Sequence, residues 1–260
     1  MQYGICLLSV VPARKEPSGT SEMVTQLLFG DRYTVVETKE DWLSIKTAFD
    51  HYPCWISLKQ HSRLSHEAFH ALQKESPVFS AEPVQLIHNH HNKQHFLITI
   101  GAALPAYHNG ICSFDQYHFT FEGQTSGIAN KKPVHDLLDT AKLFLEAPYQ
   151  WGGKSLFGID CSGFTQTVYK LNGYTLPRDA KQQVELGQPL SFVEEAEAGD
   201  LAFFDNEEGT IVHVGILLSN HEIIHASGCV RIDKFDHYGI FNVDTKKYSH
   251  TLRVIKRVMT

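Results

Sequence analysis

One cysteine in this chain stands where nucleophilic chemistry is possible. Cys161 follows Asp160 and opens CSGFTQTVYKLNG, whose apolar residues have helical spacing and whose Gly173 suits the position just after a helix end. Asp160 is a good helix N-cap, which places the thiol in the first turn of the predicted helix. There the helix dipole and unpaired N–H groups favour an anion and lower a thiol pKa. The sequence therefore predicts a thiolate nucleophile at Cys161.

Two histidines downstream are candidates for the base that activates this thiol. His213 lies in IVHVGILLS and His225 in EIIHAS, and these runs predict a strand hairpin that turns around residues 219–222. Side chains alternate between the faces of a strand, so both histidines lie on one face only if an odd number of residues connects the strands. A three-residue turn is expected. His213 would then accept the thiol proton, and His225 would bond its other ring nitrogen and fix its tautomer.

The remaining segments must position these residues, and their patterns divide the chain. Short β-rich runs with turns between them fill the N-terminal part, which is typical of a small barrel or sandwich. A short polar helix follows, with Leu64, Ala68 and Leu72 on one face, and then a second β-rich region with one alternating strand through ICSFDQYHFTFEGQ. Near Lys131 the period changes to that of an amphipathic helix, which Pro148 stops. The predicted domains are 1–62, 63–76 (a helical linker), 77–130 and 131–260.

Composition argues against several classes of function. A formal net charge of −6 without blocks of Lys and Arg gives no reason to expect a nucleic-acid partner, and no apolar run approaches the roughly 20 residues of a membrane span. The five cysteines form an odd set without a CxxC pair, which argues against a disulfide framework and a structural zinc site. We expect no metal and no organic cofactor.

The same features predict a compartment. The N-terminal run lacks the basic segment and the cleavage site of a secretory signal, and the cysteine pattern fits reduced thiols. We therefore expect a cytoplasmic protein, and the oligomeric state stays open.

The order of four short motifs resembles a known family. DCSGF, GDLAFF, HVGI and IHAS together resemble the NlpC-type papain-like cysteine peptidases, bacterial enzymes that cut cell-wall peptides, over 134–240. SEMVTQLLFGDRYTVVETKEDWLSIKT, closed by YPCWISLKQ, resembles a bacterial SH3-like barrel, and the resemblance of 77–130 to a second such barrel is weaker. The resemblance implies an α+β fold, with a papain-like cysteine peptidase domain preceded by one or two small SH3-like β-barrels.

The family resemblance assigns roles by position. It implies that Cys161 is the nucleophile, His213 the general base and His225 the third polar residue that orients the base. It also implies that Tyr149 assists the substrate oxyanion together with the backbone N–H of Cys161.

The combination of SH3-like barrels with this domain is similar to the γ-D-glutamyl-L-diamino acid endopeptidases. That similarity implies a murein stem peptide with a free N-terminal L-Ala as substrate, in cell-wall peptide recycling, with Asp160 and Ser162 binding the substrate amine. Tyr52 would complete this pocket, and Trp151 and Arg178 would line the cleft, where Arg178 is placed to pair with a substrate carboxylate. The diamino acid, diaminopimelate or lysine, stays open.

Two alternatives remain at this point. The same Cys and His pair serves an amidase or an acyltransferase equally well. A protein of another class, a non-catalytic binder of wall peptides, would keep the barrels and an inert C-terminal domain.

Overall fold

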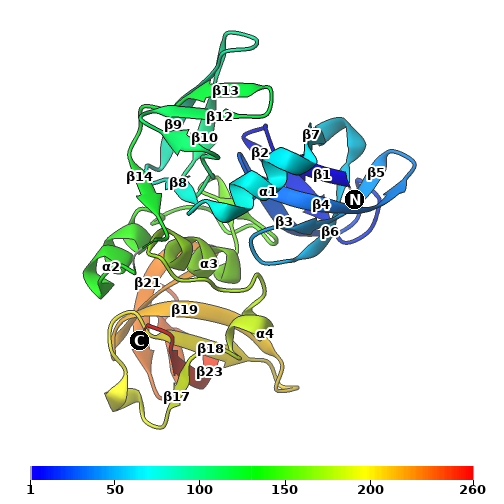
Figure 1. The fold of residues 1–260 in the computed structure, drawn as a ribbon. Coiled ribbons are helices and arrows are strands. Elements are labelled where there is room, and N and C mark those ends of the chain that lie inside the picture. Colours follow the sequence, from blue (N-terminus) through cyan, green and yellow to red (C-terminus); the bar gives the residue numbers. More distant parts are fainter. Residues whose placement is uncertain (1, 130, 260) are drawn as a thin grey trace. The chain divides into compact units, whose positions relative to one another are not determined.

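The computed structural model describes residues 2–129 and 131–259, which form two compact units (Figure 1). The first unit comprises 1–130 together with 151–156, and the second comprises 131–150 together with 157–260. The predicted domain ends at Met1, Asn130 and Thr260 lie outside the described residues. In the described part of the chain, no helix combines the length and apolar character that a bilayer span requires.

The first unit opens with a seven-stranded antiparallel sheet in the order β3-β2-β6-β5-β4-β1-β7. Burial alternates along its strands, so that Leu43 and Ile45 of one strand and Ile56 of the next enter the same core. The strands are β1 (Gln2–Ile5), β2 (Val10–Arg14), β3 (Met23–Leu28), β4 (Arg32–Lys39), β5 (Trp42–Thr47), β6 (Pro53–Ser57) and β7 (Ser62–Leu64), with the 3-10 turn η1 (Leu58–Gln60) between the last two.

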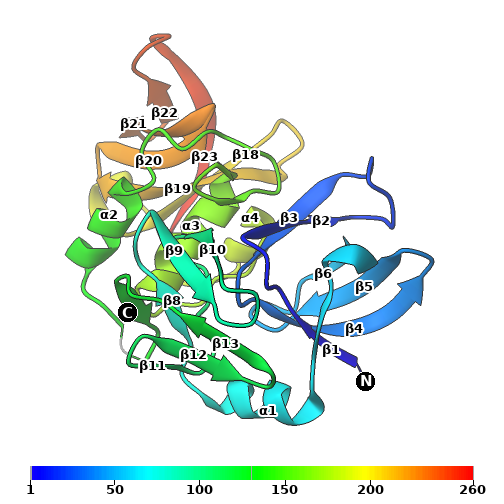
Figure 2. The same cartoon turned by 90° about the horizontal axis from the view of Figure 1, so that it is seen from above.

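The second β-rich region forms a five-stranded antiparallel sheet in the order β10-β9-β13-β12-β11, visible in Figure 2. The expected single strand through ICSFDQYHFTFEGQ was wrong, because Asp115 has a φ of 50° and begins a two-residue turn that makes a hairpin. The region's assignment as a second, diverged SH3-like barrel stays a prediction. Its strands are β9 (Val84–Asn89), β10 (Gln94–Thr99), β11 (Tyr107–His108), β12 (Ile111–Phe114) and β13 (Tyr117–Thr120), and β8 (Val78–Ser80) pairs with β14 (Thr125–Gly127).

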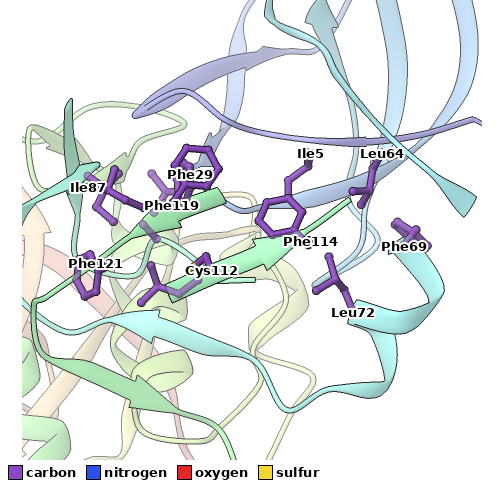
Figure 3. Packing of buried hydrophobic residues seen from close by; sticks show 14 of the residues in the cluster. Ile5, Phe29, Leu64, Phe69, Leu72, Ile87, Cys112, Phe114, Phe119 and Phe121 are labelled. Carbon is purple, nitrogen blue, oxygen red and sulfur yellow. The ribbon is translucent and has the colours of Figure 1, made fainter. Parts of the chain in front are cut away.

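One hydrophobic core joins these two sheets. Phe29, in the turn directly after β3, packs edge to face against Phe119 of β13, with ring centroids 5.0 Å apart (Figure 3). Helix α1 (His66–Lys74), capped by Ser65, adds Phe69 and Leu72 to this core, so the segment expected as a polar connector is a packed part of the unit. Leu64 lies in β7, not on the helix as expected. The first unit ends with the short strand β15 (Lys154–Ser155).

The second unit contains a seven-stranded antiparallel sheet in the order β17-β23-β18-β19-β20-β21-β22. The long strand β23 also pairs with β22, which closes the strands from β23 to β22 into a ring and leaves β17 at the edge. Helix α3 packs against β19 and β20, and α2 packs against α3. The strands are β16 (Gly158–Ile159), β17 (Gln188–Leu190), β18 (Leu201–Asp205), β19 (Ile211–Ser219), β20 (Glu222–Ser227), β21 (Cys229–Asp236), β22 (Gly239–Asn242) and β23 (Lys247–Arg257), and the helices are α2 (Val134–Lys142), α3 (Cys161–Leu171), α4 (Ala180–Gln183) and the 3-10 turn η2 (Val193–Glu195).

Candidate active site

Helix α3 begins at Cys161, as predicted. Asp160 has extended backbone angles, and its Oδ1 accepts the N–H of Gly163 at 2.6 Å, which makes it the N-cap. Asn172 ends the helix, and Gly173 follows with a φ of 85°, the left-handed conformation that glycine adopts without steric cost. The nucleophile candidate is therefore fixed at the first turn of a helix that is buried along its whole length.

The predicted lowering of the thiol pKa was wrong. Burial, followed by the charge of Asp160, raises the pKa of Cys161 to about 12, although the N–H of Val214, the Arg178 guanidinium and the N–H of Ser162 each lower it. The helix terminus does not outweigh removal from water. The N–H of Val214 also locates the thiol, because it places the sulfur against β19 one residue beyond His213.

The two histidines lie on one face of the sheet, but not for the expected reason. Only Asn220 and His221 connect β19 to β20, so the predicted three-residue turn was wrong. The odd residue is instead a β-bulge at Leu218, where the pairing shifts between Leu217 and Ser219. The bulge restores the required parity.

His213 and His225 are directly bonded. Nε2 of His213 and Nδ1 of His225 share a buried hydrogen bond of 2.8 Å, which confirms the predicted contact between them. Burial, with the neighbouring His250 and His225, lowers the pKa of His213 well below its ordinary value. Together with the raised thiol pKa, this makes a neutral thiol and a neutral imidazole the resting pair at neutral pH.

A third histidine, which the sequence analysis missed, covers the base. The ring of His250, from β23, stacks on that of His213 with centroids 4.1 Å apart and planes 21° from parallel. Burial first, and then His225, lowers the pKa of His250 to about 4. Nitrogens of the three rings lie within 4.8 Å of one another. Stacked rings direct their in-plane lone pairs side by side, not toward a common point, and two of the three share a hydrogen bond, so we interpret the cluster as packing around the base and not as a metal centre.

Asp233 and Arg231 of β21 also belong to the site and were missed. The carboxylate of Asp233 accepts Nε2–H of His225 at 3.1 Å and two N–H groups of Arg231 at 2.8 and 3.0 Å. Arg231 is paired with His225 across the strands, and Asp233 lies two residues further on. Two opposite charges at period 2, Arg231 and Asp233, alternating with the apolar Val230 and Ile232 directly after IHASG, were the available signal.

Arg178 does not lie where the sequence analysis expected it. Its side chain is 1% exposed and holds the Asp160 carboxylate with two bonds, Nη1 to Oδ1 at 2.9 Å and Nη2 to Oδ2 at 2.7 Å. Nη1 also donates to Oγ of Ser162 at 3.0 Å. A guanidinium buried in this way orients the Asp160 carboxylate, and the expected pairing with a substrate carboxylate is replaced by this internal ion pair.

The other predicted residues are distributed over both units. Tyr149 is half-buried in the second unit, and burial followed by the charges of Cys161 and Asp160 raises the pKa of its hydroxyl, which is therefore a hydrogen-bond donor at neutral pH. Trp151 belongs to the first unit and donates its indole N–H to Glu22 at 2.8 Å. Tyr52 lies in the first unit, packed against the barrel core, with its N–H bonded to Oγ1 of Thr47 at 2.7 Å.

A segment of each unit matches a known domain family. The NlpC/P60 family matches residues 146–250, and the bacterial dipeptidyl-peptidase SH3 domain matches residues 13–60. The chain is 29% identical over 217 residues to a gamma-D-glutamyl-L-lysine dipeptidyl-peptidase of Bacillus subtilis, covering 78% of this chain and 71% of the relative. It is 26% identical over 246 residues to dipeptidyl-peptidase 6 of Lysinibacillus sphaericus, covering 82% and 83%.

A solved structure supports the fold. An NlpC/P60 family protein from Bacillus cereus superposes with a TM-score of 0.82 at 23% identity, over 99% of this chain and 100% of that chain. The predicted fold class, a papain-like domain with an N-terminal SH3-like module, is thereby confirmed. The chain therefore carries an NlpC/P60 domain, the domain of a family of cysteine peptidases, behind a bacterial dipeptidyl-peptidase SH3 domain.

Proposed function

We propose that this peptidase hydrolyses the amide between γ-linked D-glutamate and the following L-diamino acid of murein stem peptides. The observation that carries the proposal is the thiol of Cys161 beside a hydrogen-bonded His213 and His225, in a chain whose relatives carry that specificity in their names. Because the thiol and the imidazole are both neutral at rest, His213 takes the thiol proton as a general base during the attack, and no thiolate is formed beforehand.

The reaction then proceeds in two halves. Sγ of Cys161 attacks the carbonyl carbon of γ-D-glutamate while His213 takes the thiol proton, and the oxyanion is stabilised by the N–H of Cys161 and the hydroxyl of Tyr149. His213 returns the proton to the leaving amine, and a thioester to the dipeptide remains. Water, deprotonated by His213, attacks this thioester and releases L-Ala-γ-D-Glu.

Selection for a free N-terminus is assigned to Asp160 and Ser162. Arg178 already neutralises Asp160, so the selection does not arise from a lone buried carboxylate. It arises from acceptor oxygens held at fixed positions, which bind an ammonium better than an acetyl amide can. The contribution of Tyr52 to this pocket stays a prediction, as does a cleft role for Trp151.

The test compares free with N-acetylated peptides, and the predicted nucleophile with a second cysteine. L-Ala-γ-D-Glu-L-Lys, its diaminopimelate analogue and their N-acetylated forms are incubated with the wild type, Cys161→Ala and the matched control Cys229→Ala, and products are followed by mass spectrometry. We expect the wild type and the control to release the dipeptide from the free peptides. We expect Cys161→Ala to lose turnover by at least about 10³-fold. Full activity in Cys161→Ala would refute the nucleophile.

The substrate pool is a separate part of the proposal. The cysteine pattern supports a reducing compartment, and we assign the enzyme to recycled or imported peptide in the cytoplasm. Fractionation of the native host, with antibody against this chain, should find it with cytoplasmic markers. Equal turnover of cross-linked peptidoglycan and of free tripeptide would contradict the recycling role.

A further inference from the structure

The buried carboxylate of Asp233 takes no part in the chemistry described so far. Its side chain is 0% exposed, and its two oxygens accept four donors. Oδ2 accepts Nε2–H of His225 and Nε–H of Arg231, and Oδ1 accepts Nη2–H of Arg231 and the backbone N–H of Val243 at 3.0 Å. A carboxylate in this position decides where the protons of its neighbours lie, because it accepts hydrogen bonds and cannot donate one.

The tautomers follow one after another from that carboxylate. Burial raises the pKa of Asp233, but the hydrogen bonds from His225, Arg231 and Val243 together lower it by more than burial raises it. The pKa lies below its ordinary value, so the carboxyl group is ionised. Nε2 of His225 must then carry a hydrogen, and in a neutral ring Nδ1 is the acceptor. His213 therefore donates its Nε2–H across the 2.8 Å bond, and its unprotonated nitrogen is Nδ1.

Arg231 holds the carboxylate in the orientation that this chain of hydrogen bonds needs. Without its two bonds, the position of the Asp233 oxygens would be fixed only by Val243 and by His225 itself. The two bonds from Arg231 match the charge of Asp233, so the pair is an acceptor without net charge. The other charged or titratable groups around His225 are His213 from β19, His250 from β23 and Asp244, which bonds Arg231 at 2.6 Å.

We propose that Asp233, held by Arg231, is the positioning residue that fixes the tautomers of His225 and His213 and leaves Nδ1 of His213 to accept the proton of Cys161. The inference rests on the proposed roles of Cys161 and His213. It extends the site by one residue pair that acts on the nucleophile through the two histidines, and it predicts an effect on proton position more than on binding.

The chain offers a matched control. Asp200 is also buried, bonds Arg257 through the same two-pronged contact at 3.0 and 2.8 Å, and accepts the N–H of Glu197 at 2.9 Å. None of the three histidines is among its hydrogen-bond partners in the described chain. Asp200→Asn therefore reports what loss of a buried aspartate–arginine pair does to this unit by itself.

The experiment measures tautomers and kinetics in the full-length chain. In wild-type protein with ¹⁵N-labelled histidine, NMR at neutral pH should show Nδ1 of His213 unprotonated and Nε2 protonated. Asp233→Asn should mix the two tautomers and lower kcat by about 10- to 100-fold with KM within about twofold, whereas Asp200→Asn should leave kcat within about twofold. Arg231→Met, which keeps the carboxylate but frees its orientation, should mix the two tautomers in part and lower kcat by less than Asp233→Asn does.

Three results would overturn the proposal. They are wild-type tautomers in folded Asp233→Asn, equal losses of kcat in the two aspartate variants, and wild-type tautomers together with wild-type kcat in Arg231→Met. If Asp233→Asn does not fold, Arg231→Met carries the decision. The NMR signal needs no substrate, so it tests the tautomers even if the γ-D-glutamyl peptides prove not to be cleaved.

Discussion

Two buried aspartate–arginine pairs flank the reacting residues, and they are built alike. Each guanidinium grips its carboxylate with two bonds, Arg178 to Asp160 on the side of the nucleophile and Arg231 to Asp233 behind the base. They differ in what else the carboxylate accepts. Asp160 takes the N–H of a helix turn and the hydroxyl of Ser162, whereas Asp233 takes a histidine.

The difference shows that one chemical unit serves two purposes. A carboxylate whose charge is matched can hold a donor without altering the local net charge. At the start of α3 the pair holds acceptor oxygens beside the thiol of Cys161. Beside His225 it determines which ring nitrogen carries the hydrogen. The pairs also differ in access to water, since the side chain of Arg178 is 1% exposed and that of Arg231 is 19% exposed.

The largest predicted effect separates the pairs by stability. Arg178→Met leaves the buried Asp160 without its cation and should lower the free energy of unfolding by about 3–5 kcal/mol. Arg231→Met should cost about 1.5–3 kcal/mol, because Arg231 is 19% exposed against 1% for Arg178, so water can replace part of the lost contact. Urea unfolding at neutral pH measures both. Equal losses would mean that the pairs are energetically the same.

The next effect concerns the hydroxyl of Tyr149, whose pKa the charges of Asp160 and Arg178 affect. The charges that act on Tyr149 come from Cys161, Asp160 and Arg178. Tyr149→Phe removes an oxyanion donor and should lower kcat by about 100-fold with stability nearly unchanged. Tyr174→Phe, beyond the far end of α3, is the control and should retain kcat. A Tyr149→Phe enzyme with wild-type kcat would remove this residue from the oxyanion site.

A smaller effect tests the role given to the first pair in substrate selection. Ser162→Ala removes one acceptor beside Asp160 but leaves both Asp160–Arg178 bonds in place. The KM of the free tripeptide should rise about three- to tenfold, which is the value of one hydrogen bond. Steady-state assays of the free and N-acetylated peptides check this. A parallel rise for the acetylated peptide would show that the serine does not distinguish the two ends.

The smallest effect is a pH dependence of stability that comes from His250 and not from the buried aspartate Asp233. The folded pKa of His250 is about 4 against an ordinary 6.5, so between these values the unfolded chain binds the proton and the folded chain does not. Stability is therefore full above pH 6.5 and falls as the pH drops toward 4. The pKa of Asp233 is lowered in the folded chain, so the stability that this carboxylate contributes is lost only below pH 3.8, its ordinary pKa. Urea titrations of His250→Gln should show a shallower loss between pH 6.5 and 4, and an unchanged slope would assign that loss elsewhere.

Local signals predicted the helix that carries Cys161 well. An N-cap aspartate, helical spacing and Gly173 lie within thirteen residues of one another in sequence order, so α3 could be placed without knowledge of the fold. The base side depends on pairing between strands. Asp233 reaches His225 through the register of β20 and β21, and His250 reaches His213 from β23, contacts that no short window contains.

The direction of the thiol pKa failed for a related reason. The helix terminus is a local feature, and it predicts a lowered pKa. Burial is set by the sheet that packs against α3, and it dominates. The role predicted for Arg178 failed likewise, because LPRDAKQQ gives no sign that its arginine turns inward to Asp160.

The bulge at Leu218 separates the length of the hairpin connection from the placement of the catalytic histidines. Facing is set by which residues pair across β19 and β20, so a one-residue slip of this register would turn His213 and His225 to opposite faces of the sheet, whereas an extra residue held in the bulge or the turn would not. Homologues that keep this pair of histidines should therefore keep the pairing that sets Gly215 opposite His225 and vary freely in the length of the connection, which makes the connection a place where a tag or loop can be grafted.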